Sequence, residues 1–154
     1  MASRKQKGSK RKSAVGSAGL RRSAPEPGEG RYFDLPEMFK RLNAKYFQNR
    51  LPPYRVIWGQ RRRQRPKNYF VFATIREDER VIRVHPALDA SFVPEWFMEY
   101  ILFHEMLHAV VPEEYDSAGR RRVHTELFKA REAEFPLYEQ ARKWEAENLD
   151  RFLR

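Results

Sequence analysis

The sequence predicts an α+β domain in which a small, three-stranded, mainly antiparallel sheet packs on a central helix and two or three further helices. Three short segments rich in aromatic and β-branched residues, 54–58, 69–75 and 80–85, predict the strands. A charged stretch, 76–79, is suited to a hairpin turn between the second and third strands. Longer segments with helical spacing and helix-compatible boundaries lie before and after them.

The first helix is predicted over residues 35–48. Asp34 is suited to the N-cap, Pro36 to the first turn and Glu37 to a capping box. Apolar residues then recur at helical spacing, and the sequence Leu51-Pro52-Pro53 ends the pattern. The segment therefore predicts an amphipathic helix packed against the sheet.

The central helix is predicted from Pro94 to about Val110, with Pro112 ending it. Its apolar residues surround the axis instead of forming one stripe, which is typical of a helix in the middle of a domain. The apolar run 92–111 also contains two histidines and three glutamates, which would be very costly in lipid. We therefore expect a buried helix and no membrane segment.

Two more helices are predicted over residues 123–134 and from Leu137 to the C-terminus, with Pro136 between them. The second is polar enough to lie on the surface. A chain of 154 residues has room for one core, and all of its aromatic residues follow residue 31. The sequence therefore predicts a single domain over residues 31–154.

Residues 1–30 carry eight basic and two acidic side chains and too few apolar ones to offset the cost of ordering the backbone, which predicts a disordered basic tail. They lack the apolar stretch of a signal peptide. The absence of cysteine excludes disulfides, thiolate zinc sites and a cysteine nucleophile, and it fits a reducing compartment. We therefore expect a cytoplasmic protein.

The central helix contains the motif HExxH, as His104-Glu105-Met106-Leu107-His108. Four residues of helix turn about 400°, so the two imidazoles stand on one face, about one turn apart. That spacing suits one zinc ion, and it predicts a zinc site with His104 and His108 as ligands.

Glu105 lies next to the first of these ligands and can reach a zinc-bound water without binding the metal. A carboxylate there can act as general base while the water attacks a peptide carbonyl. Zinc lowers the pKa of the water and polarises the carbonyl, which requires a coordination position left open. The motif therefore predicts a zinc metallopeptidase with three protein ligands, acting on a protein or peptide substrate.

The third ligand is not fixed by the motif alone. The metzincin continuation is excluded, because it requires Gly at position 111 and His at position 114, where this chain has Val111 and Glu114. His124 is the only histidine downstream, and a helix beginning there can fold back to the metal. Three carboxylates compete with it for this role: Glu113, Glu114 and Glu126.

The structural alternative is that His104 and His108 are buried polar residues bonded to the backbone. Three of the four histidines fall within 21 residues, and Glu105 would be costly to bury in an apolar helix without a purpose. We therefore favour the metal site. Tyr115, in the loop after the helix, is a further candidate for stabilising an oxyanion, although packing is its more common role.

A basic stretch lies between the first two predicted strands and is followed by Tyr69 and Phe70. Such a stretch can bind phosphates while an aromatic ring stacks on a base, or it can be a solvated loop. The basic tail and Arg120 to Arg122 favour nucleic acid slightly. The alternative to a peptidase is thus a zinc-stabilised nucleic-acid-binding module. The residues of the stretch that would contact nucleic acid are Arg61, Arg62, Arg63, Arg65 and Lys67.

Several segments between residues 35 and 130 together resemble the SprT-like metallopeptidase family. They are Leu42-Asn43-Ala44-Lys45-Tyr46-Phe47, Leu51-Pro52, Trp58, Ile82-Arg83-Val84-His85-Pro86, the HEMLH motif, and His124 with Phe128. The resemblance implies a compact, zincin-like α+β peptidase domain. It also implies that His104, His108 and His124 bind one zinc ion and that Glu105 is the catalyst.

Two departures from the family pattern are visible. The residue after the third histidine is commonly Gly in the family and is Thr125 here, and the Cys-rich zinc ribbon of many members is absent. A second zinc is therefore not predicted. Spartan-type relatives cleave proteins crosslinked to DNA, so the resemblance and the basic segments lead to the hypothesis of DNA-associated protein substrates.

Overall fold

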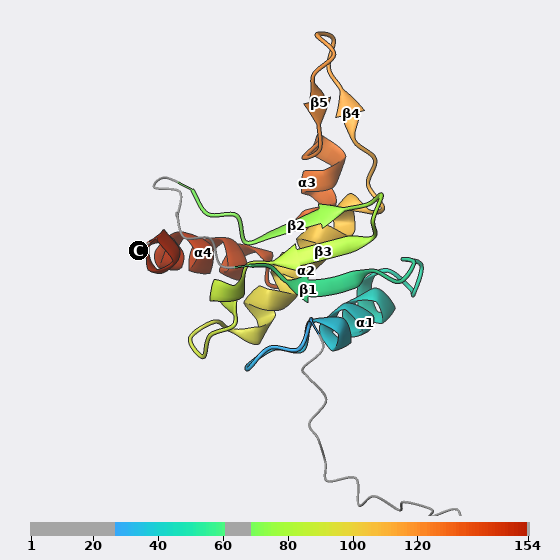
Figure 1. Cartoon of the computed structure of the whole chain (residues 1–154). Coiled ribbons are helices and arrows are strands. Elements are labelled where there is room, and N and C mark those ends of the chain that lie inside the picture. Colours follow the sequence, from blue (N-terminus) through green and yellow to red (C-terminus); the bar gives the residue numbers. More distant parts are fainter. Residues whose placement is uncertain (1–26, 61–68, 154) are drawn as a thin grey trace, which may run out of the picture.

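The computed structural model describes residues 27–60 and 69–153 (Figure 1). It contains four α-helices, one 3-10 helix and two small sheets within these residues. In chain order the elements are α1 (Leu35–Tyr46), β1 (Arg55–Trp58), β2 (Ala73–Arg76), β3 (Val81–Val84), η1 (Pro86–Leu88), α2 (Glu95–His108), β4 (Glu114–Tyr115), β5 (Arg121–Arg122), α3 (Glu126–Glu132) and α4 (Tyr138–Leu153). The predicted α+β architecture is confirmed.

The main sheet has the strand order β1-β3-β2. Strands β2 and β3 form the predicted antiparallel hairpin, with Thr74 opposite Arg83. Strand β1 pairs parallel with β3, with Val56 opposite Ile82, so the sheet is mixed where we expected mainly antiparallel pairing. The connection after β1 leads to the far edge of the sheet, and the hairpin then returns β3 to the centre. This order leaves β2 at an edge.

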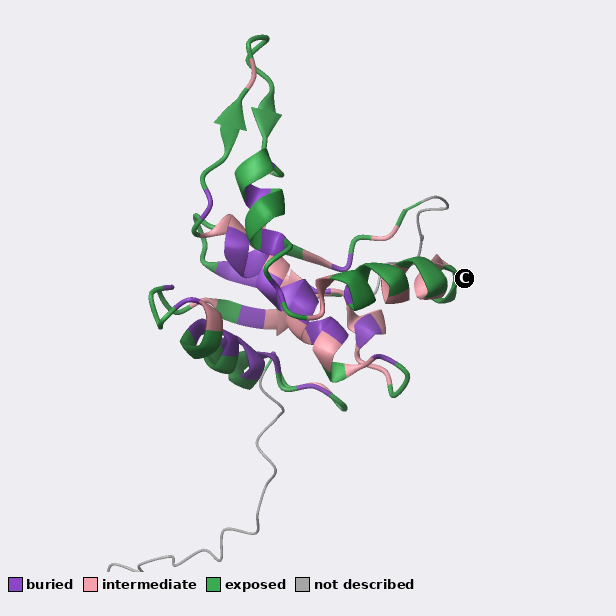
Figure 2. Ribbon diagram, turned by 180° about the vertical axis from the view of Figure 1, so that it is seen from behind, coloured by how far each residue is buried: buried purple, intermediate pink, exposed green. Residues whose placement is uncertain are grey.

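Helix α2 lies in the middle of the domain, as its apolar pattern predicts (Figures 1 and 2). Its residues Phe97, Met98, Leu102 and Met106 are completely buried. It contacts β2, α1, α3 and α4, so most of its circumference is covered by other elements. The motif at its C-terminal end is therefore held by a rigid, fully packed helix.

Helix α1 begins as predicted, because the Asp34 carboxylate accepts a hydrogen bond from the Glu37 backbone N–H at 3.2 Å. It ends at Tyr46, two residues before the predicted end. Gln48 and Asn49 adopt positive φ angles of 54° and 58°, which cannot continue a right-handed helix. The helix therefore stops through backbone conformation before the proline pair is reached.

Residues 27–30 are hydrogen bonded to the rest of the domain. The Trp58 N–H donates to the Pro27 carbonyl at 3.1 Å, and the Leu35 N–H donates to the Gly28 carbonyl at 3.0 Å. The remainder of the predicted disordered tail, residues 1–26, lies outside the described residues. The predicted basic stretch from Arg61 to Lys67 lies outside them as well.

Helix α4 packs one side against the body through the buried residues Ala141 and Phe152 and exposes most of the others, as a polar surface helix should (Figure 2). The Phe152 ring contacts Phe70 and Phe72, with centroids 5.2 and 5.3 Å away. The helix is thereby fixed beside the N-terminal end of β2. Over the described residues, no helix is both long enough and apolar enough to cross a membrane.

Candidate metal centre

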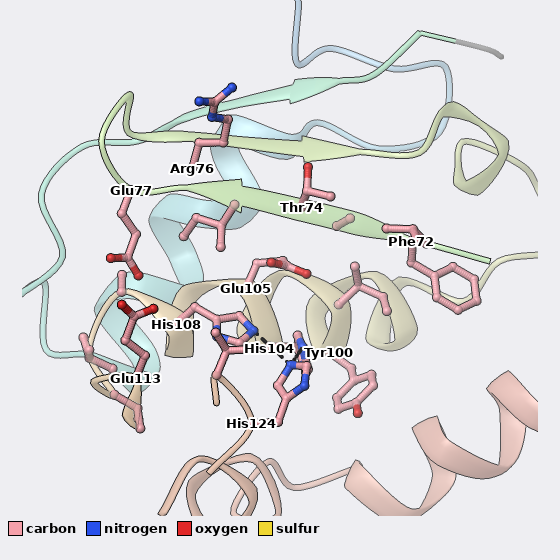
Figure 3. A pocket seen from close by; sticks show the side chains of 18 of the residues that line it. Phe72, Thr74, Arg76, Glu77, Tyr100, His104, Glu105, His108, Glu113 and His124 are labelled. Carbon is pink, nitrogen blue, oxygen red and sulfur yellow. Dashed lines mark hydrogen bonds between the residues drawn. The ribbon is translucent and has the colours of Figure 1, made fainter. Parts of the chain in front are cut away.

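Three imidazole rings converge at the C-terminal end of α2 (Figure 3). His104 and His108 are one turn apart on α2, and His124 reaches them from the segment just before α3. The Nε2 atom of His124 lies 3.2 Å from the Nε2 atoms of both His104 and His108. The structure thus brings together the three histidines that the sequence singles out.

The spacing of these nitrogens fits one metal ion. Nitrogens bound tetrahedrally at about 2.0–2.1 Å from zinc are about 3.3 Å apart, close to the two distances between the rings. The three histidines form a cluster in which each offers one ring nitrogen to a shared point. They can therefore hold a metal ion with three protein ligands.

A short arm returns the chain to the cluster. After α2 the two strands β4 and β5 pair antiparallel and project from the body (Figures 1 and 2). At the tip, the Asp116 carboxylate accepts hydrogen bonds from the backbone N–H groups of Ala118 and Arg120 at 2.9 and 2.8 Å. The arm reverses the chain direction, and His124 follows it directly.

The Phe128 ring contacts all three imidazoles. This residue of α3 is completely buried, and its ring centroid lies 5.1, 4.4 and 5.0 Å from those of His104, His108 and His124. The Thr125 hydroxyl oxygen accepts a hydrogen bond from the Phe128 N–H at 3.1 Å and caps α3. The threonine that replaces the common glycine after the third histidine therefore has a capping role.

The carboxylates that compete with His124 do not join the histidine cluster, although Glu113 lines the cleft beside it. Glu113 accepts hydrogen bonds from Arg121 and from the Tyr115 hydroxyl, Glu126 pairs with Lys129 at 3.6 Å, and Glu114 is exposed in β4. None of the three belongs to the histidine cluster. The Tyr115 side chain is mostly exposed, and its hydroxyl proton is engaged by Glu113.

The electrostatic environment keeps two of the three imidazoles neutral. Burial lowers the pKa of His108 to about 4, with further lowering from neighbouring His104 and His124. Burial also lowers the pKa of His124, and His104 contributes in the same direction. A neutral imidazole has a free lone pair, so both rings are ready to bind a metal near neutral pH.

His104 differs because a buried carboxylate lies behind it. Glu132 Oε2 is 3.2 Å from His104 Nδ1, and Glu132 is only 6% exposed. Burial lowers the pKa of His104, but the hydrogen bond to Glu132 and the nearby acidic charges outweigh it and raise the pKa. With the Nδ1 proton donated to Glu132, the His104 Nε2 atom is left for the metal.

Glu132 is itself held by Tyr100, whose hydroxyl donates to Glu132 Oε1 at 2.5 Å. Tyr100 lies one turn before His104 on α2, and burial raises its pKa, so it remains a donor. The pairing of Glu132 with Tyr100 was not predicted from the sequence. The available signal was Glu132 itself, an acid four residues after the apolar Phe128 on the same face of the predicted helix.

Glu105 is buried beside the cluster, with 8% of its surface exposed. Burial raises the pKa of its carboxyl group to about 7, against a lowering by His104. Its side chain points between α2 and β2 into a cleft of about 1090 Å³ (Figure 3). The β2 edge forms one wall of this cleft, and the three histidines lie on the opposite side.

The comparison with known protein families agrees with this geometry. The model of the SprT-like family matches residues 35–141, which includes the cluster, Glu105 and Glu132. The chain belongs to the SprT-like family. No curated protein and no solved structure matches it. SprT-like proteins are associated with zincin-like metallopeptidase domains, and this member has three histidines that can hold a metal ion.

If His124 is the third metal ligand, His124→Ala should lose most of the bound metal after dialysis, because two imidazoles bind far more weakly than three. Metal content per chain, measured by mass spectrometry, checks this. His85→Ala is the matched control, since His85 caps η1 away from the cluster. Undiminished metal in His124→Ala would transfer the role to another side chain.

Glu132→Gln should weaken metal binding by about 10- to 100-fold, the usual effect of losing a carboxylate behind a ligating histidine. Competition with a chromogenic chelator measures this affinity. Glu134→Gln is the control, because Glu134 is an exposed residue that pairs only with Arg131. Equal affinities for the two variants would exclude a role of Glu132 in orienting His104.

Proposed function

We propose that this SprT-like protein is a zinc-dependent peptidase that hydrolyses peptide bonds with Glu105 as general base. The observation that carries the proposal is the placement of a buried carboxylate beside three convergent imidazoles, at the floor of a cleft with a strand edge as its wall. Zinc is the proposed metal because three imidazole nitrogens and one open position are typical of catalytic zinc sites.

His104, His108 and His124 would hold the ion through their Nε2 atoms. When bound, zinc lowers the pKa of a water molecule and polarises the carbonyl group of the scissile bond. Phe128 and Glu132 keep the imidazoles in position, so the site needs little rearrangement to accept the ion.

Glu105 would transfer a proton from the attacking water to the leaving amine. Its carboxylate accepts a proton from the attacking water and later gives it to the leaving amine. A pKa of about 7, raised by burial, suits a group that must both take and release a proton near neutral pH. The positive charge of a bound metal would lower that pKa and favour the carboxylate that starts the reaction.

The outer edge of β2 pairs with no other strand among the described residues, which favours a peptide as the substrate. The His85 N–H donates to the Phe72 carbonyl at 2.7 Å, so Phe72 directs its peptide groups towards β3. By the alternation of an antiparallel pair, Ala73 and Ile75 direct theirs outward to the cleft that they line. An extended peptide can add to this edge as a further strand, which places its backbone across the histidine cluster.

Glu105→Gln should retain the metal and the fold but lower the rate of cleavage by about 100-fold or more, because only the proton transfer is lost. Cleavage of casein and metal content are measured on the same samples. Glu99→Gln, on the same helix, should keep both, since Glu99 faces Arg41 and not the cleft.

Unchanged cleavage by Glu105→Gln would overturn the mechanism. Zinc binding by the wild-type protein without cleavage of casein or histones, with or without single-stranded DNA, would favour the alternative of a zinc-stabilised nucleic-acid-binding module.

A second function, binding of nucleic acid, is favoured by one contact. The Trp58 N–H donates to the Pro27 carbonyl at 3.1 Å, which joins the residue after the basic tail to the strand before the basic stretch 61–67. The tail, residues 1–26, has eight basic side chains and one acidic one, and the stretch has five basic ones. Two basic segments that start from one place can contact one polyanion together, and DNA-associated proteins would then be natural substrates.

Binding to single-stranded DNA should weaken steeply as salt increases, because each phosphate contact releases counterions. Removal of residues 1–26 should make the slope of log affinity against log salt smaller. Fluorescence anisotropy with a labelled oligonucleotide measures both. A control in which Lys40 and Lys45 of α1 become Gln should keep the slope; a slope unchanged by removal of the tail would exclude its role.

A further inference from the structure

Among the described residues, one arginine that lines the cleft has no ion-pair partner. Three arginines line the cleft: Arg76, Arg121 and Arg142. Arg76 pairs with Asp78 at 3.7 Å and Glu79 at 3.4 Å, and Arg121 pairs with Glu113. Within the described part of the chain, Arg142 forms no ion pair at 4.0 Å or less. The residue as a whole is exposed and lines the cleft, where a ligand can reach it.

The fold holds Arg142 close to the candidate metal centre. It lies in the second turn of α4, next to the completely buried Ala141. Burial lowers the pKa of Arg142, but interaction with Tyr100, which includes a hydrogen bond, and the nearby charge of Glu145 outweigh this, so Arg142 stays charged. Because Tyr100 bonds Glu132 and Glu132 bonds His104, Arg142 is two side chains away from a candidate ligand.

The direction of β2 predicts which part of a bound peptide would approach Arg142. Figure 3 shows Glu77 and Glu113 at one end of the cleft and Phe72 and Tyr100 at the other. A peptide that adds antiparallel to β2 runs from the Glu77 end towards the Phe72 end. Its residues after the scissile bond therefore approach Tyr100 and the first turns of α4.

We propose that Arg142 is a specificity-determining residue that binds a carboxylate of the substrate on the C-terminal side of the scissile bond. This inference rests on the proposed peptidase function and names its substrate class. The carboxylate can come from an acidic side chain or from the C-terminus of a short peptide. Either one can form a charge-assisted, two-point hydrogen bond with a guanidinium group.

Glu145 is the acidic group that competes with a substrate carboxylate for Arg142. It lines the same part of the cleft, one turn after Arg142, and burial raises the pKa of its carboxyl group against a lowering by Arg142. If Arg142 and Glu145 formed a close ion pair, Arg142 would serve only to neutralise Glu145. Their charged groups form no ion pair at 4.0 Å or less. Replacing Glu145 by a neutral residue therefore distinguishes substrate binding by Arg142 from a role as the counter-charge of Glu145.

The family match includes the first residues of α4 and ends before the residues proposed to select the substrate. The match ends at residue 141, so Arg142 and Glu145 lie just past it. Helix α4 is nevertheless firmly attached, since Trp144 contacts Phe97 with ring centroids 4.3 Å apart and Phe152 is buried. The wall that presents Arg142 is thus rigid enough to discriminate between substrates.

The test uses a parent peptide that the full-length, zinc-loaded protein cleaves at a bond mapped by mass spectrometry. The first and second residues after that bond are replaced in turn by Glu, Gln and Lys, and short versions end in a free carboxylate or an amide. We expect the wild type to prefer an acid over Gln at one of these positions, or the carboxylate over the amide, by about tenfold in kcat/KM, which corresponds to about 1.4 kcal/mol.

Three variants and one control are compared on these peptides. Arg142→Gln should lose the preference while cleaving the Gln peptide at nearly the wild-type rate, and Arg142→Glu should prefer Lys. Glu145→Gln should keep or increase the preference for acid. Lys143→Gln, an exposed neighbour on α4, should behave as the wild type.

An acid preference that persists in Arg142→Gln, or no preference of the wild type between acidic and neutral peptides, would overturn the inference. A preference lost equally in Glu145→Gln would also overturn it, by making Arg142 a counter-charge. In each of these cases the wild-type protein still cleaves the Gln peptide, and the Glu105→Gln variant cleaves it far more slowly. Failure to cleave any peptide would instead overturn the proposed function.

Discussion

The packing of three imidazoles on one buried phenyl ring is the contact on which the candidate site depends. Phe128 is completely buried and stacks on His108 with ring centroids 4.4 Å apart. The same ring contacts His104 and His124, so a shift of α3 would remove packing from all three imidazoles. The arm formed by β4 and β5 and the cap at Thr125 serve this contact, because they decide where α3 begins.

Around this contact the polar groups are arranged in a chain that runs outward from the metal centre. His104 bonds Glu132, Glu132 accepts from Tyr100, and Tyr100 is close to Arg142. Each buried charge in the chain has a partner, which lowers the cost of placing a carboxylate in the interior. Glu105 is different, because its raised pKa reflects burial that its surroundings do not fully offset. A group whose burial is costly in this way is common at functional sites.

The topology of the sheet decides how a substrate would approach. Because β3 pairs with both β1 and β2, the hairpin strand β2 has one edge that is unpaired within residues 27–60 and 69–153, and that edge faces the histidines across the cleft. A sheet in which β1 bordered the cleft would place a different set of peptide groups beside Glu105. Helix α4 lines the same cleft with Arg142 and Glu145. The two ends of the cleft offer different side chains to a ligand, with Glu77 and Glu113 at one end and Phe72 and Tyr100 at the other (Figure 3).

The sequence by itself determined the helices, their approximate bounds and the residues of the candidate centre. Proline and capping residues mark α1 and α2, and the spacing of His104 and His108 is a local property of any helix. For the third ligand, the sequence offered His124 and three nearby carboxylates, and the resemblance to the SprT-like family favoured the histidine. Tertiary structure alone decided the parallel pairing of β1, the edge position of β2 and the partnership of Glu132 with His104. These depend on contacts between residues far apart in the chain, and neither periodicity nor spacing records which distant segments meet.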